Sequence, residues 1–153
     1  MRNNRWLLAG GVLSALAAAL HVAVIFGGGD WYRFFGAGEA MARAAEAGSL
    51  RPALITAGVA AGLLVWALYA FSGARVLPRL PLLRTGLILI SAVYLLRALA
   101  PALLLILRPE LIDAFVVWSS LIVLVYGLCY AIGVCTAWRD LAPRRRESSA
   151  QRA

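Results

Sequence analysis

Residues 85–107 read TGLILISAVYLLRALAPALLLIL, an apolar run that contains Arg97, the one charge in the interior of any hydrophobic segment of the chain. A helix of about 20 apolar residues crosses the hydrocarbon of a bilayer. Because that interior tolerates a cation poorly, an intramembrane arginine marks a candidate functional site. Small Gly86 and Ala100 share the helical stripe of Arg97 and favour the close approach of another helix. We therefore expect Arg97 to face protein, beside a carbonyl that Pro101 leaves without a donor.

The composition places the whole chain in a membrane. Hydrophobic residues make up 63% of the 153 residues and charged residues 14%, whereas charged residues are about a quarter of a soluble domain. Three further apolar runs predict spans at 6–26, 52–73 and 111–138. The prediction is an all-α integral membrane protein, a four-transmembrane-helix bundle that forms one domain over residues 1–142. Residues 143–153 are polar and basic, which predicts a disordered cytoplasmic tail.

The arginines are distributed unevenly between the two sets of span ends. One set of ends has ten arginines and two carboxylates, and the other has four arginines and five carboxylates. This is the positive-inside pattern, and it predicts that both termini are cytoplasmic (N-in/C-in). Because membrane orientation explains these arginines, the high pI does not indicate a nucleic-acid partner.

The first span allows two interpretations. An arginine-bearing start and an alanine-rich body also fit a cleaved signal peptide covering about residues 1–20. The apolar run is longer than a usual signal-peptide core, which favours a retained helix. Gly10, Ser14 and Ala17 form a seam of small residues on this helix that leads to His21, the sole histidine.

The segment 27–51 predicts an extracytoplasmic loop that carries a short interfacial helix. Gly27, Gly28 and Gly29 predict a flexible joint, and residues 30–35 (DWYRFF) supply aromatic side chains typical of a membrane interface. Residues 39–47 are alanine-rich and predict a helix with an ion pair between Glu39 and Arg43. Long connections of this kind are often lids or binding loops.

Residues 27–56 read GGGDWYRFFGAGEAMARAAEAGSLRPALIT and are followed by further spans. With those spans, this run resembles a group of small uncharacterised bacterial inner-membrane proteins with four helices. The resemblance covers most of residues 5–138. It implies the topology and a bacterial inner-membrane location, and it brings no known activity, cofactor or site.

Two helix faces predict packing. Gly58 and Gly62 form GxxxG in the second span, a signal for close helix contact. A partner helix within the chain is favoured, and a homo-oligomer or another membrane protein stays open. Ser119, Tyr126 and Tyr130 share a face of the fourth span, and their hydroxyls need partners inside the bundle.

The candidate site lies in the outer half of the bundle. Arg97 and His21 are on predicted inward faces, and every outer carboxylate belongs to a loop or a helix end. The partner of Arg97 is therefore a carboxylate dipping inward, with Glu39 and Asp113 favoured, or the anionic head of a ligand. A purely structural ion pair stays open. The candidate ligand-binding residues are Arg97, His21, Glu39, Asp113, Tyr94 and Tyr126.

Catalytic chemistry has little support in the sequence. It contains no metalloprotease, thioredoxin-like or serine-elbow motif, and one histidine cannot supply paired haem ligands. We expect no cofactor and no metal. An enzyme with His21 as base and Arg97 as anion clamp stays open. The favoured function is binding or transport of an amphipathic or anionic small molecule in an outward-facing bundle cavity. The alternative is a non-catalytic accessory or structural membrane subunit that packs through small-residue helix faces.

Overall fold

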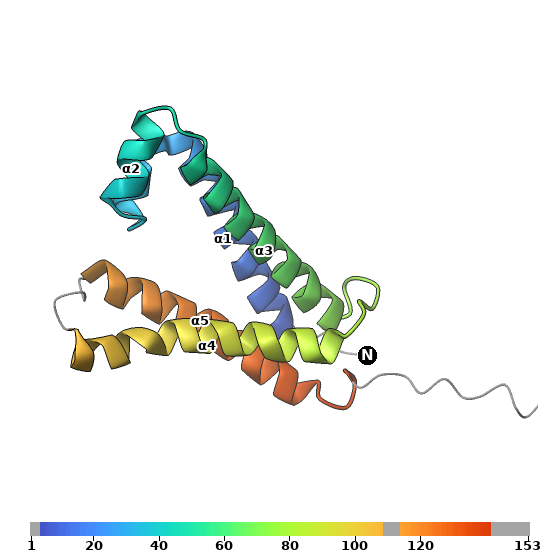
Figure 1. The fold of residues 1–153 in the computed structure, drawn as a ribbon. Helices are drawn as coiled ribbons and strands as arrows, with labels where there is room; N and C mark the ends of the chain where they lie inside the picture. Colours follow the sequence, from blue (N-terminus) through green and yellow to red (C-terminus); the bar gives the residue numbers. More distant parts are fainter. Residues whose placement is uncertain (1–3, 109–113, 142–153) are drawn as a thin grey trace, which may run out of the picture.

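The computed structural model describes residues 4–108 and 114–141, and all regular structure in these residues is helical. Four helices are long and apolar enough to cross a membrane, as predicted, and a short one lies between the first two of them. Figure 1 shows their arrangement. The helices are α1 (Arg5–Phe34), α2 (Glu39–Glu46), α3 (Arg51–Gly73), α4 (Leu83–Leu107) and α5 (Ala114–Thr136).

Helix α1 is longer than the predicted span 6–26 and ends at Phe34. The predicted joint at residues 27–29 is narrower than expected: α1 is kinked at Gly28, which alone leaves the helical conformation, with φ 68° and ψ −154°. Such a left-handed φ is readily available to glycine. The helix resumes after Gly28, where Tyr32 is buried against Val24 and Ala42. The aromatic residues at the end of α1 are thus held in place by the packing of Tyr32 on α2.

The four long helices form two helical hairpins. Helix α1 packs along α3, and α4 packs along α5 (Figure 1). Glycines allow the close approach in each pair: the Phe71 ring of α3 lies against Gly11, and Leu95 of α4 lies against Gly127. In Figure 1 the hairpins cross near the start of α1 and spread apart toward α2.

The hairpins share one core, in the half of the spans nearest Asn4, Gly73 and Thr136. Leu7 is fully buried there, and its side chain lies against both Gly73 and Gly133. On α4, the buried members of this core end at Tyr94. We call this end of the molecule the basic end; its described arginines are Arg5, Arg75, Arg79, Arg84 and Arg139.

A second, smaller core joins α2 to the end of α1. Val24, Tyr32 and Ala42 are its buried members, and Phe35, Met41 and Ala45 pack against them. Helix α2 begins at Glu39, as predicted, and ends one residue before the end of the predicted helix 39–47. A helix of eight residues is marginal by itself in water, so this apolar contact explains why it forms here.

Candidate functional site

Arg97 is exposed, and the prediction that it faces the protein interior is wrong. Its Nη1 donates a hydrogen bond to Ser120 Oγ at 3.3 Å. That hydroxyl in turn donates to the Val116 carbonyl at 2.6 Å. Arg97 lies one turn beyond Tyr94, the last buried core residue of α4. Among the described residues its guanidinium meets a neutral hydroxyl on α5 and no carboxylate.

His21 is half-buried and satisfied within its own helix. Its Nδ1 lies 2.7 Å from the Ala17 carbonyl, four residues back. Because a carbonyl only accepts, Nδ1 carries the hydrogen and Nε2 is left as the acceptor. No hydrogen bond joins His21 to Arg97 in the part of the chain that the structure describes.

Glu39 belongs to a different cluster and is not the partner of Arg97. Its carboxylate accepts from Arg33 Nε at 2.8 Å and from Arg43 Nε at 2.9 Å. The guanidinium of Arg33 also bonds both oxygens of Glu46. Hydrogen bonds from Arg33 and then Arg43 lower the pKa of Glu39 to about 2. This cluster fastens α2 to the end of α1. Asp113, the other predicted partner, lies outside the described residues.

Tyr94 is part of the core and is not open to a ligand. Its hydroxyl lies 2.9 Å from Ser14 Oγ, which lies 3.0 Å from the Tyr130 hydroxyl. The Tyr130 hydroxyl is also 2.9 Å from the Trp66 carbonyl. Tyr126 is half-buried, and its ring centroid is 5.6 Å from that of Tyr94. This network joins all four spans and confirms the prediction that the Tyr130 hydroxyl has partners inside the bundle.

The predicted packing role of Gly58 and Gly62 within the chain is wrong. A Cβ atom built on either residue would meet nothing within 4 Å. Helix α3 instead buries the face that contains Thr56, Ala60 and Ala67. The GxxxG face of α3 is open on this chain.

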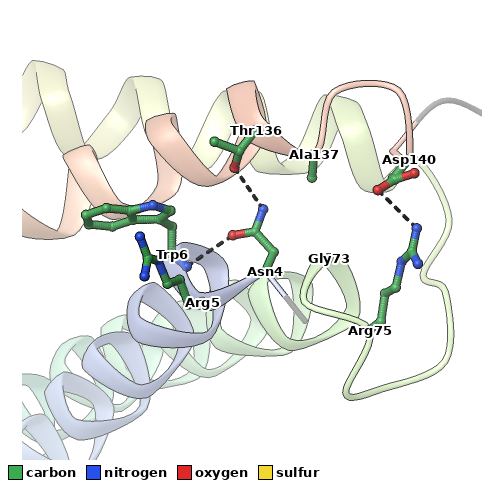
Figure 2. Close-up of a pocket in the computed structure, with 8 residues that line it drawn as sticks. All are labelled: Asn4, Arg5, Trp6, Gly73, Arg75, Thr136, Ala137 and Asp140. Atoms are coloured by element: carbon green, nitrogen blue, oxygen red, sulfur yellow. Dashed lines mark hydrogen bonds and ion pairs between the residues drawn. The ribbon is translucent and has the colours of Figure 1, made fainter. Parts of the chain in front are cut away.

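A cavity of about 390 Å³ opens at the basic end (Figure 2). We call it the basic-end pocket. None of the predicted site residues lines it. The lining residues are Asn4, Arg5, Trp6, Gly73, Arg75, Thr136, Ala137 and Asp140.

Side-chain bonds fix the wall of the basic-end pocket. Asn4 Oδ1 accepts from the Trp6 and Leu7 amides and caps α1, while its Nδ2 donates to the Gly133 carbonyl at 2.8 Å and to Thr136 Oγ1 at 3.1 Å. An N-cap contact of this kind stabilises a helix start. Asn4 thereby ties the start of α1 to the end of α5.

Sequence reasoning missed this pocket because its lining comes from the start of α1, the end of α3 and the residues after α5. In the sequence, membrane orientation is a sufficient explanation for Arg5 and Arg75, the two arginines that line the pocket. Comparison of the chain with protein-family models, with curated proteins and with solved structures gives no match. The function is therefore argued from the chain's own residues.

Proposed function

We propose that the chain is a multi-pass bacterial inner-membrane protein that binds or transports an amphipathic anion, with Arg97 as the contact for the anionic group. Both termini are cytoplasmic in this proposal, and α2 lies on the outer membrane surface. The observation that carries it is the exposed guanidinium of Arg97 in the apolar helix α4, with a neutral hydroxyl as its hydrogen-bond partner.

The depth of Arg97 favours a bound anion. At 1.5 Å per residue, Arg97 lies about 15 Å from the end of α4 at Leu107, which is near the middle of a hydrocarbon layer about 30 Å thick. An uncompensated arginine at the centre of a span costs about 3 kcal/mol on insertion scales. Ser120 contributes a hydrogen bond but no charge. A carboxylate or phosphate bound to the guanidinium fork would neutralise it.

The surroundings of Arg97 favour an amphipathic ligand over a small soluble anion. Leu96, Leu99 and Leu103 are 69%, 58% and 59% exposed on the same helix. An acyl or other apolar chain can pack along these lipid-facing side chains while its anionic group reaches Arg97, whereas a small soluble anion would have to leave water to reach it. The ligand would enter from the membrane side, since Arg97 lies on an open face and not in an enclosed bundle interior.

Replacing Arg97 by leucine is expected to abolish binding and leave the fold intact. Among the described residues its side chain makes one hydrogen bond, to Ser120 Oγ, and substitutions at exposed positions change stability by about 0.5 kcal/mol or less. Arg97→Lys should weaken binding because the planar fork is lost. The measurement is mass spectrometry of amphiphiles that co-purify with the protein in mild detergent, together with the thermal midpoint.

Arg51→Leu is the matched control, since Arg51 is exposed at the start of α3 and lies outside the apolar interior. It should retain the co-purified molecule. A parent protein without any amphiphile, combined with a strongly lowered thermal midpoint in Arg97→Leu, would contradict the ligand proposal.

A second candidate is an accessory membrane subunit, favoured by the open GxxxG face of α3. Gly58 and Gly62 meet no atom of this chain, and such faces let another helix approach closely. The partner would be a second copy or another membrane protein. A change of assembly size in Gly58→Leu, in a parent that carries no amphiphile, would favour this candidate.

The proposed orientation is tested with single cysteines at Ala40 and Leu77, both of which are exposed. The background replaces Cys129 and Cys135, the two free cysteines, by alanine. In intact cells a membrane-impermeant thiol reagent should label position 40 and not position 77. Labelling at 77 alone would mean the opposite orientation, and permeabilised cells, in which both react, serve as the control.

A further inference from the structure

The basic-end pocket has a small apolar floor and a charged rim. Gly73 and Ala137 are buried at its base, whereas Arg5, Arg75 and Asp140 are exposed around it. Figure 2 shows Arg5 on one side, Arg75 and Asp140 on the other, and Asn4 between them. Its volume of about 390 Å³ falls within the range of small-ligand sites, roughly 300–1,000 Å³.

The two arginines are the donors available to a ligand. Asn4 Nδ2 already donates to Gly133 and Thr136, and Thr136 Oγ1 donates to the Ile132 carbonyl at 2.8 Å. Arg5 has no ion pair with a carboxylate in the described residues; its guanidinium lies 5.8 Å from the centroid of the Trp6 ring. A cation over an aromatic face is attracted to it while its N–H groups stay free.

Arg75 forms an ion pair with Asp140, and a bound anion can take the place of the Asp140 carboxylate. Arg75 Nη2 lies 3.1 Å from Asp140 Oδ2, and the two side chains are 40% and 61% exposed. Ion pairs between exposed groups are weak. Asp140 is the one carboxylate among the described residues of the basic end, which has five arginines. The local field therefore favours a bound anion.

The backbone of Arg75 is unusual for an arginine. Its φ is 65°, and it follows the C-cap Ala74 of α3. The amides of Arg75 and Val76 donate to the Ser72 and Phe71 carbonyls, at 3.1 and 2.9 Å. This is the Schellman arrangement, in which the left-handed position is usually glycine. At Arg75 this position carries a long charged side chain, which glycine can replace without cost to the backbone.

We propose that the basic-end pocket binds a phosphate group, carried by an anionic phospholipid or by a soluble phosphate ester. Figure 2 shows the Arg5 side chain beside Trp6 and the Arg75 side chain turned to Asp140, so both side chains turn into the pocket when the phosphate binds. Phosphate offers several oxygens and so accepts from two separate guanidinium groups, each matched to it in geometry. Trp6 beside the pocket is a side chain typical of the headgroup level of a bilayer. Basic pockets between span ends suit lipid headgroups, which supports the lipid as one source. This site is independent of Arg97.

The test is titration of the purified full-length chain in detergent with dioleoylphosphatidylglycerol, read by native mass spectrometry, and with glycerol 3-phosphate at constant ionic strength, read by the thermal midpoint. Arg75→Gly removes the guanidinium and supplies the residue that the left-handed position prefers. It should weaken binding about tenfold, as expected for loss of a charged hydrogen-bond donor, without lowering the thermal midpoint. Arg5→Gln should weaken binding similarly.

Asp140→Asn should tighten binding because it frees Arg75, whereas a purely structural role for the pair predicts no gain. Arg139→Gln, an exposed arginine outside the pocket lining, is the matched control and should bind like the parent. Binding of the lipid alone or of the ester alone identifies the source. Binding of neither, or equal losses in Arg5→Gln, Arg75→Gly and Arg139→Gln, would overturn the proposal.

Discussion

Replacing Tyr130 by alanine is expected to lower the free energy of unfolding by about 3–5 kcal/mol, the usual range for removing a buried aromatic ring. Tyr130 is fully buried, and its ring lies 5.5 Å from that of Tyr94 and directly against Gly10. Its hydroxyl contacts Ser14 and the Trp66 carbonyl. Tyr130 therefore joins the two hairpins, and its loss would leave a cavity at their junction. Equilibrium unfolding in mixed micelles measures the effect.

Tyr130→Phe separates packing from hydrogen bonding. It retains the ring and removes only the hydroxyl, which should cost about 1 kcal/mol for a hydrogen bond between spans. Equal losses in Tyr130→Phe and Tyr130→Ala would show that the hydroxyl network, and not ring packing, holds the hairpins together.

Replacing Gly133 by leucine is expected to destabilise the protein by about 3 kcal/mol, at the upper end of the usual range for overpacking. Even a Cβ atom at Gly133 would lie 2.6 Å from Leu7 Cγ and 3.1 Å from the Leu7 amide nitrogen. Neither atom is the end of a flexible side chain, so α1 and α5 would have to move apart. The thermal midpoint in detergent should fall accordingly.

Gly58→Leu is the matched control on α3, because a Cβ atom at Gly58 meets nothing within 4 Å in the described part of the chain. Its thermal midpoint should stay near that of the parent. A larger loss in Gly58→Leu than in Gly133→Leu would contradict the packing described here and would indicate a partner helix on α3.

The four spans and α2 were predictable because each depends on its own segment. An apolar run of spanning length needs no knowledge of its neighbours, and the alanine-rich residues 39–47 have a helical preference of their own, which the contact with α1 completes over 39–46. The end of α1 was not predictable in this way. Three consecutive glycines indicate a loop, but only Gly28 leaves the helix, because Tyr32 has a partner in Ala42.

The surroundings of the site residues depend on how the hairpins are placed, which no single helix encodes. The periodicity of α4 puts Arg97 on a stripe with small residues, yet that stripe runs past the end of the shared core at Tyr94. The predicted ion pair of Glu39 with Arg43 is confirmed, because it depends only on helical spacing, whereas the predicted pairing of Glu39 with Arg97 is wrong. Arg33, six residues before Glu39, reaches it first because the chain turns back between α1 and α2. The prediction that the GxxxG motif of α3 packs on a helix of this chain is wrong for the same reason, because the motif describes one helix and does not say where its neighbours lie.

The division into hairpins also bears on the order in which the protein is assembled during synthesis. Helices α1 to α3 are consecutive and pair with one another, so this half has its partners before the ribosome has made α5. The bond from Asn4 to Gly133 joins residues 129 positions apart and forms only when the last helix has been inserted. Since chains assemble their N-terminal units first, the bond from Asn4 to Gly133 is among the last contacts that form during synthesis of the protein. A chain truncated within α5 before Gly133 would retain the hairpin of α1 and α3 but would lack the hydrogen bond that joins Asn4 to α5.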